Sequence, residues 1–301
     1  MRQADYAMYT AKNGKTLDPV RYDVSLELDK LREAEITSAL ENAIRQKHEL
    51  TIAYQPIVHA ASGKMELAEA LVRWKSETLG SVPPSVFIPV AEKTGMIVEI
   101  GRQVIDMVFH DLKDVPHLNV SINLSPVQLR SKSILKDIER LAKRHGIEPT
   151  RVTFEVTESV LVEDPELTAF LLDSLRKQGF GLALDDFGIG YSSIGYLRKF
   201  QFDKLKVDKS FIDDIGVADN NENLMKALVY LARSLDMRIV AEGVETERQR
   251  FMLTEEAYDL LQGYLFSRPL PLAELMPFIP ETQLGSHASS ELEELNFNIA
   301  S

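Results

Sequence analysis

Cysteine is absent from all 301 positions of the chain. Its absence excludes disulfides, thiolate metal sites and cysteine nucleophiles, and it is compatible with a reducing cytoplasm. Long apolar runs are missing too, since no stretch approaches the ~20 uninterrupted apolar residues that a membrane span needs. The N-terminal segment MRQADYAMYTAKNGK lacks the apolar centre of a signal peptide. We therefore expect a cytoplasmic chain that makes no membrane contact of its own, which leaves a membrane-tethered parent protein open.

The chain also has fewer basic than acidic residues. Lys and Arg total 34 against 46 Asp and Glu, which gives a formal net charge of -12 at pH 7. An acidic surface does not attract nucleic-acid backbones, so no DNA or RNA duplex is expected as a partner. An anionic substrate would need a local device that overcomes this field, and bound cations are the obvious one.

What the chain does have is a regular alternation of strand-like and helix-like patterns. Eight short apolar runs rich in β-branched residues lie at 50–58, 65–74, 118–125, 151–158, 180–188, 202–208, 237–245 and 260–267. Apolar residues at spacings of three and four predict helices between most of them, over 96–112, 133–146, 165–179, 222–235 and 245–257. The gap at 59–64 is too short for a helix, so the first two strands are expected to form a hairpin.

From the second strand onward, the β-then-α order favours a mostly parallel sheet. Eight strands in about 220 residues suit an α/β fold of the TIM-type (β/α)8 barrel, here with an antiparallel first strand. An open doubly wound sheet is the alternative that the pattern leaves open. Residues 31–49 are expected to form a linker helix, and the acidic C-terminal tail at 284–301 is expected to be flexible.

Polar side chains gather toward the C-terminal ends of the predicted strands. In chain order they are Glu69, Asn123, Glu155, Glu158, Asp185, Asp186, Lys206, Glu242, Glu245 and Gln262. In a barrel those ends converge on one mouth, where the active sites of this fold are built. Side chains far apart in sequence would then lie close together.

Such a cluster of carboxylates needs compensation, because repulsion and desolvation would otherwise keep several of them protonated. Glu, Asp and the amide oxygen of Asn suit Mg or Mn as ligands. Adjacent Asp185 and Asp186 can serve two ions if one carboxylate bridges them, which is the usual arrangement for phosphodiester cleavage. Lys206 would orient or polarise the attacking water, and Glu242 would be the general base or a ligand of the second ion.

Each feature alone also has a purely structural interpretation. Asp185 and Asp186 can form a turn or a helix cap, and Lys206 can be an exposed strand-edge residue. The segment EVTE can be a solvated strand end or a capping box. A coincidence of such features at successive strand ends, in one order, favours the metal cluster instead.

Nine motifs occur in order between residues 54 and 270. They are YQPIV, EALVRW, FIPVAEKTG, SINLSP, FEVTES, LDDFGIGYSS, FDKLKVDKSF, AEGVET and QGYLFSRPL. In this series the chain resembles the EAL domain family, the barrel phosphodiesterases that hydrolyse cyclic di-GMP. The resemblance implies an enzyme that converts cyclic di-GMP to linear pGpG, with its barrel domain at residues 50–283.

The resemblance assigns one group of residues to metal binding. The ligands that it implies are Glu69, Asn123, Glu155, Asp185, Asp186 and Glu242. The first four of these would hold one ion, and Asp185 would bridge to a second ion near Asp186 and Glu242. Family members commonly need Mg or Mn and are inhibited by Ca, which takes more ligands at longer distances.

A second group is implied to act on water and substrate. Glu242 would be the general base, and Lys206 would contact the nucleophilic water. Glu158 would brace the loop that begins at Asp186. The substrate contacts implied are Arg73, Gln262 and, as a weaker candidate, Gln55.

One departure from the family pattern lies in that loop. The family usually has DDFGTG or DDFGAG, whereas this chain has Ile189, which is bulkier than Ala and cannot donate a hydrogen bond as Thr does. The dynamics of the loop are therefore open, although no ligand is lost. Family members commonly form homodimers through the EAL domain, with this loop linking dimer geometry to catalysis.

The N-terminal segment RQADYAMYTAKNGK resembles the last helix of a GGDEF domain, the cyclic-di-GMP-synthesising partner often placed before an EAL domain. Residues 1–30 are expected to be a remnant of such a domain, so the chain would be a fragment of a GGDEF–EAL protein. It carries no GG[DE]EF signature and cannot be a cyclase. Two other functions stay open, a catalytically silent cyclic-di-GMP receptor and a barrel hydrolase of other phosphodiesters.

Overall fold

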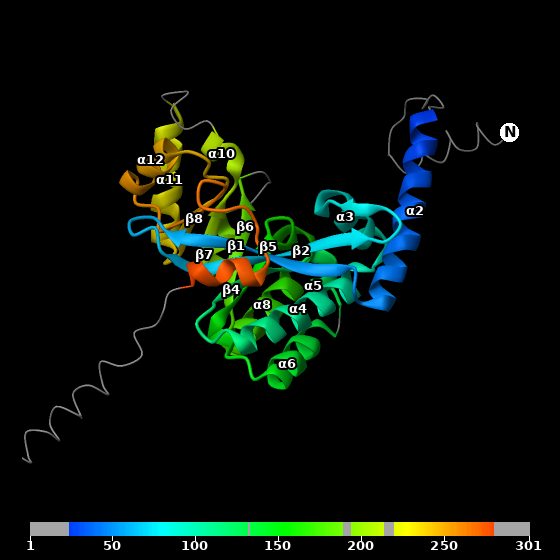
Figure 1. Ribbon diagram of the computed structural model, residues 1–301. Coiled ribbons are helices and arrows are strands. Elements are labelled where there is room, and N and C mark those ends of the chain that lie inside the picture. The colour runs from blue at the N-terminus through cyan, green and yellow to red at the C-terminus, as the bar shows by residue number, and fades with distance from the viewer. Residues whose placement is uncertain (1–23, 132, 189–193, 214–219, 280–301) are drawn as a thin grey trace, which may run out of the picture. The chain divides into compact units, whose positions relative to one another are not determined.

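The computed structural model describes residues 24–131, 133–188, 194–213 and 220–279, and in these ranges nine strands form one mixed sheet (Figure 1). The strands are β1 (Leu50–His59), β2 (Met65–Ser76), β3 (Gly80–Val82), β4 (Val120–Asn123), β5 (Val152–Thr157), β6 (Gly181–Phe187), β7 (Lys204–Val207), β8 (Arg238–Ala241) and β9 (Leu260–Gln262).

Helices connect most of the strands. The α-helices are α2 (Val24–Gln46), α3 (Pro84–Thr94), α4 (Ile97–Asp114), α5 (Pro126–Leu129), α6 (Ile134–His145), α7 (Val160–Glu163), α8 (Pro165–Lys177), α9 (Ile194–Phe200), α10 (Lys209–Asp213), α11 (Asn220–Ser234), α12 (Glu247–Glu255) and α13 (Leu272–Leu275), and two 3-10 turns cover Pro149–Arg151 and Met276–Phe278. None of the helices in the described ranges is both long and apolar enough to cross a bilayer.

The sheet closes into a barrel. Its strand order is β1-β9-β8-β7-β6-β5-β4-β2-β3, and an additional pairing of β1 with β2 closes the barrel, while β3 pairs only with β2 among the described strands. Strand β1 is antiparallel to β9, whereas β2, β4, β5, β6, β7, β8 and β9 pair in parallel. The predicted TIM-type barrel with an antiparallel first strand is therefore confirmed, and the open doubly wound alternative is wrong.

The turn between β1 and β2 has the hairpin geometry that its length predicts. The N–H of His59 donates to the Lys64 carbonyl at 2.9 Å, and the N–H of Gly63 donates to the His59 carbonyl at 2.8 Å. Gly63 has a φ of 67°, a value at which a Cβ is disfavoured. This tight return reverses the chain, which makes β1 the antiparallel strand of the barrel.

Several details differ from the sequence prediction, which did not include strand β3 or the helices α3, α5, α7, α9, α10 and α13. Strand β3 and helix α3 were not expected, because β3 is only three residues long and α3 contains Pro89. Helix α3 nevertheless starts where a proline fits, at its first position, and Gly95 ends it with a φ of 77°. The predicted strands over 237–245 and 260–267 extend too far, since the residues after Ala241 and Gln262 leave the ladder for loops.

Contacts divide the chain into two units, one with residues up to Leu50 plus Trp74–Ile97, the other with Thr51–Arg73 plus the chain from Val98 onward. In the first unit α2 packs against α3 and buries Ile36, Leu40 and Ala43, which recur at spacings of four and three. The helix expected over 31–49 is α2, which begins earlier, at Val24, and ends three residues earlier, at Gln46. Most of the proposed GGDEF remnant, and the tail at 284–301, lie outside the described residues.

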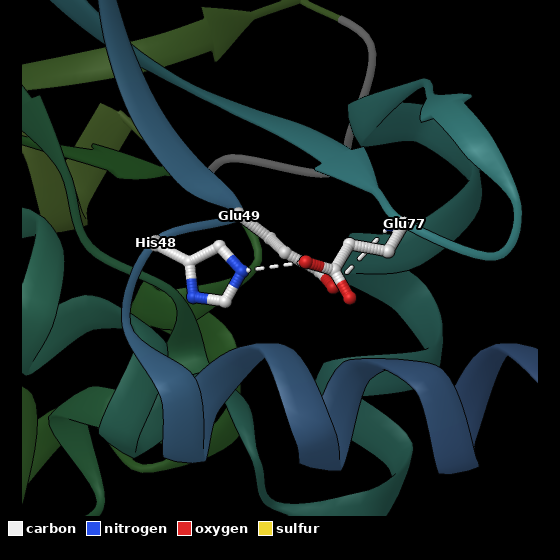
Figure 2. Close-up of side chains that lie close together, drawn as sticks. All are labelled: His48, Glu49 and Glu77. Carbon is white, nitrogen blue, oxygen red and sulfur yellow. Dashed lines mark hydrogen bonds and ion pairs between the residues drawn. The ribbon is translucent and has the colours of Figure 1, made fainter.

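The first unit also contains a buried carboxylate, Glu49, between His48 and Glu77 (Figure 2). One Glu49 oxygen accepts a hydrogen bond from Trp74 Nε1 at 2.8 Å, and the other accepts from the backbone N–H of Glu77 at 3.3 Å. His48 Nε2 lies 3.0 Å from a carboxylate oxygen of Glu77, and both of these side chains are mostly exposed. Trp74 in turn packs edge-on against Phe87, with ring centroids 5.5 Å apart. Glu49 is therefore a structural anchor for the Trp74 ring.

In the second unit, the barrel interior is layered. An apolar cluster of Ile57, Leu67, Val240 and Leu260 fills one level. Because side chains alternate along a strand, residues two positions further on point to the same interior. From Leu67, Val240 and Leu260, that step leads to Glu69, Glu242 and Gln262. The apolar level thus forms the floor under the polar residues predicted at the strand ends.

We expect Glu49→Ala to destabilise the protein by about 1–3 kcal/mol, because it leaves the buried Trp74 N–H without an acceptor. Glu49→Gln retains one acceptor oxygen, so its loss of unfolding free energy should be less than half that of Glu49→Ala. Urea unfolding measures both. Glu77→Ala is the matched control, since it removes only an exposed pair and should change the free energy of unfolding by about 0.5 kcal/mol or less. Equal stability of Glu49→Ala and Glu77→Ala would contradict the anchor role.

Candidate active site

The residues predicted at the strand ends meet at one mouth of the barrel. The strands β2, β4, β5, β6, β7 and β9 and the segment after β8 contribute Glu69, Asn123, Glu155, Asp185, Lys206, Gln262 and Glu242. Neighbouring strands bring pairs of them directly opposite each other. Asn123 is in register with Glu155, and Asp185 of β6 lies opposite Thr157, two residues beyond Glu155 on β5.

Lys206 is the centre of this cluster. Its side chain is 2% exposed, and its ammonium group contacts four carboxylates. The distances from Nζ are 2.5 Å to Glu155, 2.6 Å to Glu242, 3.2 Å to Asp185 and 3.4 Å to Glu69. Burial lowers the pKa of Lys206, but the charges of these four acids outweigh it and raise the pKa well above its usual value. The four acids thus favour the protonated, cationic form of the lysine.

Glu69 is held by amide donors as well as by the lysine. Asn123 Nδ2 donates to one oxygen at 2.6 Å, and Gln262 Nε2 donates to the other at 2.7 Å. Burial opposes ionisation, but Lys206 and these two hydrogen bonds lower the pKa of Glu69. Gln55 lies next in this chain of contacts, since its Oε1 accepts from Gln262 Nε2 at 3.2 Å.

One ammonium group cannot neutralise four carboxylates, and the excess negative charge appears in the pKa values. Burial raises the pKa of Glu155 to about 8; Lys206 opposes this shift, and the charges of Glu69 and Asp185 add to it. Burial raises the pKa of Glu242 well above its usual value, with further contributions from Asp185 and Glu69 and with Lys206 in opposition. The isolated cluster therefore holds protons that a bound cation would displace.

The donor set fits a hard divalent cation. Asp185, Asp186 and Glu242 each offer an oxygen within 4.8 Å of the others. Gln262 Oε1 is buried and has no hydrogen-bond partner among the described residues, so an acceptor is left free at the edge of the cluster. Every potential ligand at the mouth is an oxygen, which suits Mg or Mn. His48, Glu49 and Glu77 form another group of potential ligands (Figure 2). Both carboxylate oxygens of Glu49, the buried member of this group, already accept hydrogen bonds.

Asp186 turns away from the strand. Its φ is 55°, and the register of β6 against β7 shifts between Leu184 and Phe187, so the two aspartates form a bulge. Its N–H donates to Asp185 Oδ1 at 3.0 Å. Burial and the charge of Asp185 raise the pKa of Asp186. The bulge is what directs two successive carboxylates toward the same mouth.

Asp208 is a residue of the mouth that the sequence analysis missed. It follows β7, two positions after Lys206, and its charge contributes to the raised pKa of Asp186. Its Oδ1 accepts from the N–H of Ser210 at 2.9 Å, which caps the start of α10. Strand alternation could have predicted Asp208, because a residue two positions after Lys206 points to the same side of the strand.

The remaining predicted residues lie around this cluster. Arg73, at the far end of β2, is half-buried, and its NH1 donates to the Val72 carbonyl at 3.0 Å. Burial lowers the pKa of Arg73, and the charge of Glu69 opposes this. Glu158 is buried after β5, and its Oε2 accepts from the N–H of Gly188 at 3.4 Å. Ile189 lies outside the described residues.

The loop that carries Glu242 is fixed by close backbone packing. The N–H of Val244 donates to the Gln262 carbonyl at 2.9 Å, and the N–H of Leu265 donates to the Val244 carbonyl at 3.0 Å. A Cβ on Gly263 would lie 2.6 Å from the Val244 carbonyl carbon, so only glycine fits there. This contact holds the end of β9 and the Glu242 loop together.

Comparison with known proteins points to one family. A model of the EAL domain family matches residues 37–269. The chain is 36% identical over 281 residues to the "Bifunctional diguanylate cyclase/cyclic di-GMP phosphodiesterase MucR" of Pseudomonas aeruginosa, which covers 92% of this chain and 41% of MucR. It is 38% identical over 253 residues to the "Cyclic di-GMP phosphodiesterase NbdA" of the same organism, which covers 82% of this chain and 32% of NbdA. The chain thus spans less than half the length of these relatives.

A solved structure gives the same result. The PaMucR phosphodiesterase in complex with c-di-GMP matches with a TM-score of 0.76 and 37% sequence identity, over 80% of this chain and 99% of that chain.

The raised pKa of Glu155 predicts a pH dependence of stability in the metal-free protein. Between the usual value of 4.5 and about 8, the folded state keeps a proton that the unfolded state has lost, so stability falls as pH rises through this window. Glu242 acts in the same direction. The contribution of Glu69, whose pKa is lowered, is complete above 4.5 and does not change here.

In buffer with EDTA we expect a Tm roughly 5 °C lower at pH 8.5 than at pH 6, measured by scanning calorimetry. Glu155→Gln carries no titratable proton at this position and should lose much of the slope. A Tm that rises with pH in EDTA would show that the cluster does not hold the excess protons.

Proposed function

Because the chain belongs to the EAL domain family, we propose that it is a metal-dependent phosphodiesterase that hydrolyses cyclic di-GMP to linear pGpG. One observation carries the proposal. A buried lysine is surrounded by four carboxylates at the C-terminal mouth of a barrel, and an asparagine and a glutamine amide hold one of these acids. This is an acidic site with an incomplete charge balance, in the place where barrel enzymes perform catalysis.

Two groups of oxygen ligands would hold the ions. Glu69, Asn123, Glu155 and Asp185 would bind one Mg or Mn ion, and Asp185 would bridge to a second ion with Asp186 and Glu242. When bound, the ions would neutralise the carboxylates and the substrate phosphate and would lower the pKa of a water molecule. Ca is expected to inhibit, because it takes more ligands at longer distances than Mg.

The residues of the chain itself would act on the attacking water. A carboxylate oxygen of Glu242 would accept a proton from the water while the water oxygen forms a bond to phosphorus. The P–O3′ bond then breaks, the 3′ oxygen takes up a proton, and linear pGpG is the product. Lys206, whose ammonium group contacts Glu155 and Glu242, would orient the water by donating a hydrogen bond.

The substrate is an anion and the chain carries a net charge of -12, so attraction must be local. Arg73 suits this role, because no carboxylate among the described residues lies within ion-pair distance of its guanidinium group, which can therefore meet a phosphate. Gln262 and Gln55 are proposed to contact the substrate at the same mouth. Glu158 is proposed to brace the loop that starts at Asp186 through its contact with Gly188.

The assembly around this site is proposed from the family. We expect a cytoplasmic homodimer formed through the EAL domain, in a parent protein with a GGDEF domain before it. The relatives are longer than this chain, which agrees with such a parent.

Incubation of the purified chain with cyclic di-GMP and Mg or Mn, followed by chromatography, tests the activity. We expect conversion to pGpG, its loss on addition of EDTA, and its recovery with excess Mg. Tight binding of unchanged dinucleotide would instead identify a silent receptor, and cleavage only of other phosphodiesters would identify a different substrate.

Glu242→Gln should lower kcat by about 10²–10⁴-fold, because the amide cannot accept the proton of the water. The Tm measured with Mg should stay close to that of the wild type, since Gln is nearly isosteric with Glu. Asp185→Asn is the comparison, because it should weaken metal binding as well as turnover. Near-normal kcat in Glu242→Gln would contradict the base role.

A further inference from the structure

The short helix α10 (Lys209–Asp213) follows directly after the strand that carries Lys206. It contacts both of the loops that bear acidic residues of the mouth, the loop after Asp186 and the loop of Glu242. These contacts are made by side chains that have no role in the proposed chemistry.

The first contact joins Phe211 to Gly188, two residues after Asp186. A Cβ at Gly188 would lie 2.5 Å from Phe211 Cε2, so the edge of the ring rests on the glycine backbone. The φ of Gly188 is 104°, a conformation that favours glycine. The N–H of Gly188 also donates to Glu158 at 3.4 Å. The start of this loop is therefore held by a carboxylate and by an aromatic ring.

The second contact joins Lys209 to Gly243, the residue after Glu242. A Cβ at Gly243 would lie 2.6 Å from Lys209 Cβ, so the aliphatic part of the lysine rests on the backbone beside Glu242. The ammonium group of Lys209 pairs with Glu245. Further along, Gln249 Nε2 donates to the Ile212 carbonyl at 3.2 Å, and Gln249 Oε1 accepts from the N–H of Glu245 at 2.8 Å. Helix α10 is thus attached to this loop at several points.

Both loops need such support, because the strand ladder does not supply it fully. Asp185 and Asp186 lie in the bulge where the pairing of β6 with β7 shifts register. Glu242 lies beyond the end of β8 and keeps one ladder-like hydrogen bond, from its N–H to the Val207 carbonyl at 3.1 Å. The distance between the two groups of ligands then depends on an element that contacts both.

We propose that Phe211 and Lys209 are positioning residues, through which α10 sets the distance between Asp186 and Glu242 and so the affinity of the site for its second metal ion. This inference rests on the proposed function. Partners outside the ligand set commonly change metal affinity or activity by about 10–100-fold when they are replaced.

The two functional parts of Lys209 can be separated. The Lys209 side chain is 44% exposed and the side chain of its ion-pair partner Glu245 is 45% exposed, and ion pairs open to solvent contribute little to stability. The packing of the aliphatic part on Gly243 is then the larger effect. Lys209→Met keeps that part and removes the charge, whereas Lys209→Ala removes both.

The test measures Mn²⁺ binding to the metal-free full chain by electron paramagnetic resonance, together with kcat and KM for cyclic di-GMP. For Phe211→Ala and Lys209→Ala we expect a Kd for Mn²⁺ about 10-fold higher and a kcat about 10-fold lower, with KM changed less than about twofold. Lys209→Met and Phe211→Leu should stay within about threefold of the wild type. Ser210→Ala is the matched control, since its exposed side chain on the same helix should leave both values unchanged.

If Phe211 and Lys209 had a merely structural role, their Ala variants would have a lower Tm but an unchanged Kd for Mn²⁺. Lys209→Met and Phe211→Leu would then not restore metal binding. The inference is overturned if the wild type binds Mn²⁺ and hydrolyses cyclic di-GMP while Phe211→Ala and Lys209→Ala match Ser210→Ala. If Phe211→Ala does not fold, the comparison of Lys209→Ala with Lys209→Met alone tests the inference. A wild type that neither binds Mn²⁺ nor hydrolyses the dinucleotide would overturn the proposed function itself, which is a separate outcome.

Discussion

A single buried ammonium group organises the mouth of this barrel. Lys206 contacts Glu69, Glu155, Asp185 and Glu242, which come from four different strands or strand ends. None of these acids would be tolerated there alone, because burying an unpaired carboxylate is costly. The lysine makes the cluster possible, yet one positive charge leaves it negative overall. The site is therefore suited to accept protons or cations, and the proposed binding of divalent ions would follow from that imbalance.

The barrel supplies the geometry that this imbalance requires. Parallel strands end at the same level, so one polar residue per strand is enough to build a ring of ligands. The apolar level of Ile57, Leu67, Val240 and Leu260 lies beneath that ring and keeps water out of the interior. The antiparallel β1 closes the sheet without interrupting this pattern, because Gln55 still reaches Gln262.

Loops after the strands position the remaining acidic residues of the mouth. Asp186 and Glu242 lie where the ladder is irregular or has ended, so their positions depend on glycines and on the side chains packed against them. Gly188, Gly243 and Gly263 each allow another group to approach the backbone closely. Helix α10 contacts the first two of these glycines. A short helix without any proposed ligand is thus part of the architecture of the site.

Much of this protein could be predicted from local patterns. The eight strands of the barrel, the hairpin at 59–64 and the strand-end positions of Glu69, Asn123, Glu155, Asp185 and Lys206 follow from periodicity, because alternation and strand order act over short distances. Strand β3, Asp208 and the helices α3, α5, α7, α9, α10 and α13 were missed, since each depends on a partner distant in sequence or on a short element with a weak pattern. The motif series identified the family, which the comparisons then supported.

Only the tertiary structure determines which charged groups are in contact and how many acids contact the same lysine. Sequence spacing could not reveal that one lysine serves four acids, that Gln262 joins Glu69 to Gln55, or that Phe211 and Lys209 rest on two glycines from different loops. Those contacts join residues more than twenty positions apart, and their distances are set by strand register and barrel closure. Local chemistry determined which groups this chain carries; only closure of the sheet determined that they face one another.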